Sequence, residues 1–117
     1  MAKDREAQLA AFWDGVEALT PLPRAVYLMS GFDEKSYAEI AAWLDVDADV
    51  VRAAMIHAIC VVAEAVRNQV PAYERPANVR KAEAALLRRY EQCQAALPFD
   101  DWLRQGGPAA DRRHSCA

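Results

Sequence analysis

The chain has 117 residues, with 14 Lys and Arg against 17 Asp and Glu, and this mild acidity argues against a strong non-specific binder of polyanions. The length fits one domain and excludes a multidomain enzyme with separate cofactor and substrate lobes. A hydrophobic content of 54% with only 4 Gly excludes global disorder and a glycine-lined cofactor loop, and no apolar run is long enough to span a membrane.

The apolar residues recur at helical spacing over nearly the whole chain, so we expect an all-α protein. The first helix is expected over about residues 4–19. Thr20 then suits the N-cap, and Pro21 the first turn, of a second helix over residues 21–31. The apolar side chains expected on the inner face of the first helix are Leu9, Phe12, Trp13, Val16 and Leu19.

A capping box marks the start of the third helix, because Ser36 and Glu39 can satisfy each other's backbone N–H groups. This short helix covers residues 37–44, and a three-residue turn separates it from a long helix over about residues 48–68. The spacing is that of a helix-turn-helix, although an ordinary helical hairpin fits it too. The residues expected to hold the motif together are Tyr37, Ile40, Ala41, Val46, Val51 and Met55.

Two further helices are expected after a proline-bounded loop. The first covers about residues 77–97 with apolar positions close to a 3.5-residue repeat, and Pro98 ends it. Residues 99–103 then form a short amphipathic turn. We therefore expect a helix-turn-helix domain, a C-terminal helical extension packing on it, and a disordered tail. These three parts cover residues 1–68, 76–105 and 106–117.

Three stretches of sequence before and around the turn form a distinctive pattern. They are LPRAVYLMSGFD over residues 22–33, SYAEIA over 36–41 and LDV over 44–46. These stretches resemble region 4 of bacterial sigma-70-family factors, most closely the extracytoplasmic-function group, and the resemblance covers about residues 19–65. It implies a four-helix domain that reads the promoter −35 element and docks on the β-flap of RNA polymerase. The short segment before residue 19 leads us to expect a stand-alone, diverged region 4 without the promoter-melting region 2.

The surface that the resemblance assigns to DNA or to a partner protein is poor in cations. Base readout and phosphate contacts favour Arg, Lys, Asn and Gln, and the first half of the long helix has a single Arg. Residues 1–47 hold four cations against nine acids, which repel phosphate. The residues assigned to this surface are Asp49, Val50, Arg52, Ala53 and His57.

Two functional hypotheses follow. The first is a transcription-related sigma-like protein that contacts promoter DNA, RNA polymerase or a sigma or anti-sigma type regulator. The second is a degenerate helix-turn-helix that does not bind DNA. It uses Trp43, Ile56 and the long helix to bind a protein or a second copy of itself. The intact turn favours the first hypothesis, and the missing cations favour the second.

One basic surface is expected on the helix over residues 77–97, in a segment where residues 76–117 hold seven cations against five acids. A solvated helix face is the ordinary interpretation, and a contact for nucleic acid or an acidic partner is the functional one. Its residues are Arg80, Lys81, Arg88 and Arg89.

No pattern predicts catalysis or a cofactor. His57 and Cys60 lie one helical turn apart but supply only two of the four ligands of a zinc site, so we expect no metal. No nucleophile-base motif is present, so we expect no enzyme. The charged N-terminus is unlike a signal peptide and indicates a cytoplasmic protein. Reduced thiols are expected at Cys60 and Cys93.

Overall fold

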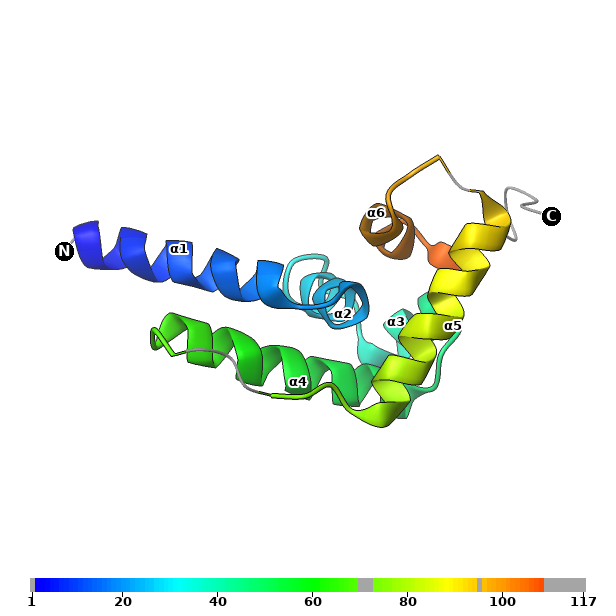
Figure 1. Ribbon diagram of the computed structural model, residues 1–117, viewed down its shortest axis with the longest axis horizontal. Helices are drawn as coiled ribbons and strands as arrows, with labels where there is room; N and C mark the ends of the chain where they lie inside the picture. Colours follow the sequence, from blue (N-terminus) through cyan, green and yellow to red (C-terminus); the bar gives the residue numbers. More distant parts are fainter. Residues whose placement is uncertain (1, 70–72, 95, 109–117) are drawn as a thin grey trace.

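The computed structural model of the protein describes residues 2–69, 73–94 and 96–108 (Figure 1). Within these ranges the chain is helical and has no strand, which confirms the all-α expectation. None of the helices is long and apolar enough to cross a membrane in the part of the chain described. The six helices are α1 (Ala2–Ala18), α2 (Pro21–Gly31), α3 (Tyr37–Leu44), α4 (Ala48–Val66), α5 (Ala77–Cys93) and α6 (Phe99–Arg104).

The helix boundaries follow local signals in the sequence. Helices α2 and α3 begin and end at the predicted residues. Helix α5 ends four residues before the predicted position, because Gln94 takes the left-handed conformation (φ 54°) and its N–H bonds to the Tyr90 carbonyl. This is the usual geometry of a helix C-terminus, and the apolar repeat that continues to Leu97 gave no sign of it.

The capping predictions had different outcomes. In α3, the Glu39 N–H donates to Ser36 Oγ at 3.1 Å, and the Ser36 N–H donates to Glu39 Oε1 at 3.0 Å. Hydrogen bonds that the Glu39 carboxylate accepts from the Ser36 backbone and side chain lower its pKa. Thr20 occupies the N-cap position of α2, but its side chain makes no capping hydrogen bond. Thr20 is therefore the N-cap residue, as predicted, but its hydroxyl does not cap the helix.

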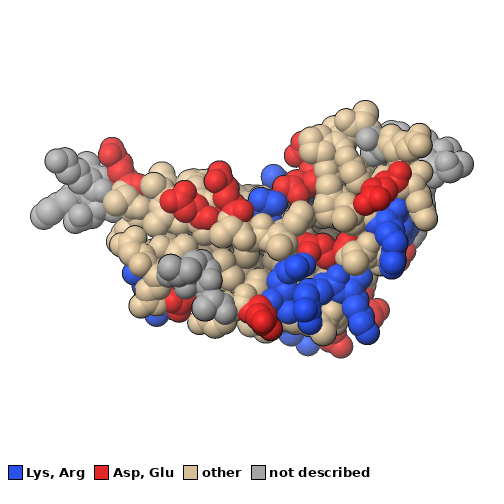
Figure 2. Space-filling model, in the orientation of Figure 1, with Lys and Arg blue, Asp and Glu red and all other residues tan. Residues whose placement is uncertain are grey.

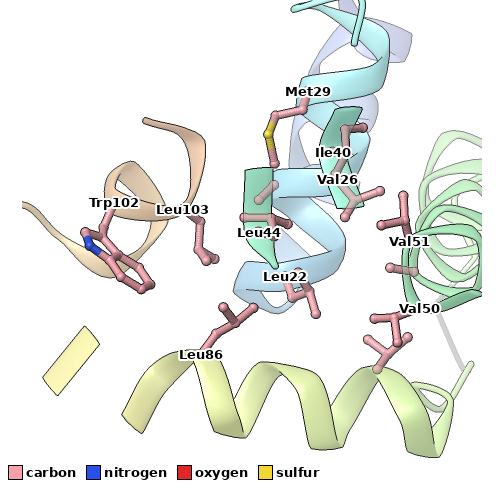
Figure 3. Packing of buried hydrophobic residues seen from close by; sticks show 13 residues of the cluster. Leu22, Val26, Met29, Ile40, Leu44, Val50, Val51, Leu86, Trp102 and Leu103 are labelled. Carbon is pink, nitrogen blue, oxygen red and sulfur yellow. The ribbon is translucent and has the colours of Figure 1, made fainter. Parts of the chain in front are cut away.

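The larger core lies between α2, α3, the first half of α4, α5 and α6. Figure 3 shows Leu86 of α5 facing Leu22 of α2, and Leu103 of α6 pointing towards Leu44 of α3. The side chains of Leu22, Leu44 and Leu103 are fully buried. Full burial of a leucine contributes about 2 kcal/mol, so α5 and α6 are integral parts of the fold.

The smaller core joins α1 to the second half of α4, which run side by side (Figure 1). A Cβ atom added at Gly15 would lie 2.8 Å from the Ala65 Cβ, so this glycine permits the two helices to approach closely. Leu9 and Trp13, which we expected to face inwards, are exposed. The buried residues of this core are Val16, Leu19, Ala58, Val61 and Val62.

The C-terminal expectations need two corrections. Gly106, Gly107 and Pro108 are buried, although we placed them in a disordered tail. Gly107 has φ +42°, and its Cβ position is 3.7 Å from Leu44 Cδ2, so the chain turns back onto the larger core. Cys93 is disulfide-bonded and not a reduced thiol, whereas Cys60 is free. Residues 109–117 lie outside the described ranges.

Candidate functional site

The helix-turn-helix is formed by α3, the turn over residues 45–47, and α4. Asp45 adopts the left-handed conformation (φ 56°), and the Val46 N–H donates to the Ala41 carbonyl at 3.0 Å. Ile40 and Val51 are fully buried between the two helices. Ala41, Val46 and Met55 are half-buried against the same core. Tyr37 is 38% exposed, so it lies at the edge of the motif and not in its interior.

The surface of α4 that the sequence assigned to DNA or a partner is divided into two parts. Val50 and His57 are each only 8% exposed, and Ala53 is half-buried. Asp49 and Arg52 remain exposed, and their side chains form an ion pair at 3.5 Å. A face that we expected to be open is therefore largely covered, and its remaining charges neutralise each other.

Helix α5 covers the start of α4. Val50 packs in the larger core together with Leu86 of α5, and a pocket of about 330 Å³ lies between the turn and α5. At the rim of this pocket, Arg89 Nη1 lies 3.2 Å from the Asp45 carboxylate. The sequence did not predict which side of α4 would receive α5, because the apolar residues of α4 extend over more than half of its circumference.

Glu83 is a structural residue that the sequence analysis missed. Its Oε2 atom accepts a hydrogen bond of 2.7 Å from the Leu22 N–H in the first turn of α2, and its Oε1 atom pairs with Arg75. A buried carboxylate at a helix N-terminus satisfies a backbone donor and interacts favourably with the helix dipole. The available signal was the position of Glu83 between Val79 and Leu86 in the apolar stripe of α5.

His57 lies beside this Arg75–Glu83 pair. Burial lowers the pKa of His57, and the nearby Arg75 guanidinium lowers it further. A hydrogen bond from the His57 ring to the Glu74 backbone raises the pKa of His57, and so does the negative charge of the Glu83 carboxylate. Burial has the largest effect, so the pKa is lowered overall. His57 therefore belongs to the packing between α4 and the segment that leads into α5. We had expected it on an open surface.

The predicted basic surface lies on α5 (Figure 2). Arg80, Lys81 and Arg88 are exposed, whereas Arg89 is half-buried and paired with Asp45. Figure 2 also shows Asp and Glu side chains along α1, and further acidic side chains lie among the basic ones at the α5 end of this face.

Large apolar side chains are exposed in two groups, one where α1 meets the end of α2 and one on α4. Trp13 stacks on Phe32 with a centroid distance of 5.8 Å, and Leu9 is one turn away on α1. Ile56 and Ile59 are exposed on α4. Trp43, in contrast, is half-buried under the Lys35 ammonium group, whose Nζ atom lies 4.3 Å from the ring centroid.

The described residues contain no cluster of three or more His, Cys, Asp and Glu side chains that could hold a metal ion.

The sequence comparison gives one result: residues 9–58 match the family model described as Sigma-70, region 4. This match begins in α1 and ends in the middle of α4, so it includes α3, the turn and the first part of α4, and it stops before α5. No curated protein and no solved structure matches the chain.

Proposed function

Residues 9–58 are a sigma-70 region 4 helix-turn-helix, and from this premise we propose that the chain contacts a protein of the transcription machinery and does not read promoter bases with α4. The proposed partner is RNA polymerase or a sigma or anti-sigma type protein. The protein would then act in the cytoplasm, as a binding module without enzymatic activity.

The observation that carries this proposal is the burial of Val50 and His57 on the side of α4 assigned to DNA. A recognition helix reads bases with donor and acceptor side chains that enter the major groove. Here that side of α4 packs against α5 and the segment before it, and the exposed Arg52 is paired with Asp49. Base readout by α4 would require α5 to leave a core in which Leu86 is buried.

The surface that suits a protein partner is the aromatic patch, which we define as Leu9, Trp13 and Phe32. Exposed aromatic residues are enriched in the energetic centres of protein interfaces. Acidic side chains lie along the same helix, α1 (Figure 2), which favours a partner with basic residues around an apolar centre. The patch lies within or next to the matched helices, where the region 4 fold is present.

The experiment is a pull-down of RNA polymerase subunits and sigma or anti-sigma proteins from extracts of the source cell, with the full chain as bait. We expect recovery by the wild type and a loss of about tenfold when Trp13 and Phe32 are both replaced by Ala. Leu87→Ala on α5 is the control, because Leu87 is also exposed but lies outside the patch. Absence of all these proteins from the wild-type eluate would refute the proposal.

A second candidate function is DNA binding through the backbone, and the exposed cations of α5 favour it. Binding of random and −35-like duplexes at low salt would be measured by fluorescence polarisation. If Arg80, Lys81 and Arg88 contact phosphates, replacing all three with Ala should reduce the slope of log K against log salt by about 2 to 3. No binding at micromolar protein concentration would exclude this function.

A further inference from the structure

The middle of α4 has an apolar face that no helix of the described chain covers. Ile56 is 57% exposed and Ile59 is 47% exposed, although both lie in the middle of a 19-residue helix. Helix α1 packs on the opposite side of α4, where Ala58, Val61 and Val62 are buried. The two isoleucines lie one turn apart, so they form a contiguous apolar patch, which is the kind of surface that interaction sites use.

The residues around these isoleucines form a single stripe, which we call the outer face of α4. They recur every three or four positions and therefore lie one above another along the helix, over about 27 Å. Cys60 is half-buried at the edge of this stripe. The members of the outer face are Asp49, Arg52, Ile56, Ile59, Ala63 and Arg67.

The charges at the two ends of the outer face are opposite. Asp49 stands at the N-terminal end with its side chain 84% exposed, and Arg67 stands at the C-terminal end with 64% exposed. Asp49 pairs with Arg52 at 3.5 Å, and Arg67 pairs with Glu64 at 3.7 Å and donates from its Nε atom to the Ala63 carbonyl at 3.4 Å. Exposed ion pairs of this length are weak and leave both end charges accessible to a partner.

We propose that a second copy of this chain covers the outer face, with its own α4 packed antiparallel on the first. A two-fold axis near Ala58 then places Asp49 of each copy opposite Arg67 of the other, and Ile56 opposite Ile59. The contact is isologous, so one surface serves both copies. A parallel arrangement would place Asp49 opposite Asp49 and Arg67 opposite Arg67, and this repulsion selects the antiparallel one.

The contact is narrow, because it uses one side of one helix. Stable interfaces bury about 800 Å² on each partner, and a stripe of about 27 Å in length falls below this area. We therefore expect a weak, concentration-dependent dimer with a dissociation constant in the micromolar range. In this dimer Arg52 lies within the contact, which removes the last exposed cation on the first half of α4 from DNA.

The test is sedimentation equilibrium of the full chain over a wide concentration range, with circular dichroism to check that each variant is folded. Ile56→Glu should weaken dimerisation at least about tenfold, because it places a charge in the apolar centre. Leu87→Glu, an exposed leucine on α5, is the matched control and should leave dimerisation unchanged. A wild-type chain that stays monomeric at all concentrations overturns the proposal, as does a dimer that Ile56→Glu does not weaken.

A charge swap tests the antiparallel register. Asp49→Arg and Arg67→Asp should each weaken the dimer by about threefold, and the double variant should restore it, because the opposite charges then face each other again. Failure of the double variant to restore a dimer that both single variants weaken contradicts this register. The outer face does not include Trp13 or Phe32, so recovery of transcription proteins in the pull-down succeeds or fails independently of this dimer.

Discussion

The two cores of the protein differ in how completely they are enclosed. The larger core is surrounded by five helices, and its central leucines have no exposed surface. The smaller core consists mainly of α1 against the second half of α4, and large apolar side chains remain exposed on both of these helices. One side of α4 is thus buried along the helix, first in the larger core and then against α1, while Ile56 and Ile59 on its other side and apolar residues of α1 remain exposed.

Because of this difference, residues of α4 that are close together in the sequence lie in different environments. Val50 and Val51 of α4 belong to the larger core and hold the helix-turn-helix together. Ile56 and Ile59, further along the same helix, are exposed. Helix α5 and the segment that leads into it cover the part of α4 that a sigma-70 region 4 domain would be expected to direct at DNA. The contact surfaces that we propose are the aromatic patch and the outer face of α4, and the exposed cations of α5 are the candidate contact for DNA.

The largest expected effect comes from breaking the larger core at its C-terminal extension. Leu103→Ala should lower the free energy of unfolding by about 3 kcal/mol, because it leaves a cavity beside Leu44. Leu97→Ala removes the same atoms from an exposed leucine and should change the free energy of unfolding by less than about 0.5 kcal/mol. Urea denaturation measures both, and equal effects would show that α6 is not part of the core.

The second prediction concerns the polar link between α5 and α2. Glu83→Ala should lower the free energy of unfolding by about 2 kcal/mol, because it leaves the Leu22 N–H and the Arg75 guanidinium without their carboxylate. Glu91→Ala on the exposed side of α5 is the control and should have little effect. Thermal denaturation of the two variants compares them, and a Glu83→Ala variant as stable as the control contradicts this role.

The third prediction addresses the smaller core. Gly15→Ala should lower the free energy of unfolding by about 1 kcal/mol, since the new methyl group lies 2.8 Å from the Ala65 Cβ and α1 must move away from α4. Gly31→Ala meets no atom within 4 Å and should be neutral or slightly stabilising. Hydrogen exchange should show faster exchange in α1 for Gly15→Ala only; unchanged exchange there would mean that the helices can accommodate the methyl group.

The smallest effect is expected from pH. The pKa of His57 is lowered in the folded protein, so below the ordinary value of 6.5 the unfolded chain binds a proton that the folded chain resists. Stability therefore falls as the pH drops below this value and down to the folded pKa, and above it the histidine has no effect. His57→Gln should lose this component of the pH dependence in urea titrations between pH 7.5 and about 5. Identical pH profiles for the two proteins would mean that His57 is not buried in solution.

Much of the fold could be predicted because its signals are local. The capping box of Ser36 and Glu39 fixes the start of α3, and Pro21 fixes the start of α2. The candidate site was less predictable. Five residues on one part of α4 were chosen from a resemblance, and burial then separated Val50 and His57 from Asp49 and Arg52. Helical periodicity places residues on a face, but it does not say which neighbour covers that face.

The sequence by itself determined that this protein is all-α, where most of its helices begin, and that α3, the turn and α4 form a helix-turn-helix, most of which lies within the match to sigma-70 region 4. These features depend on interactions between residues a few positions apart. Only the tertiary structure decided that α5 closes over the turn and that Glu83 reaches Leu22, because these contacts join segments more than forty residues apart. The same packing decided which side of α4 is buried and which side stays exposed.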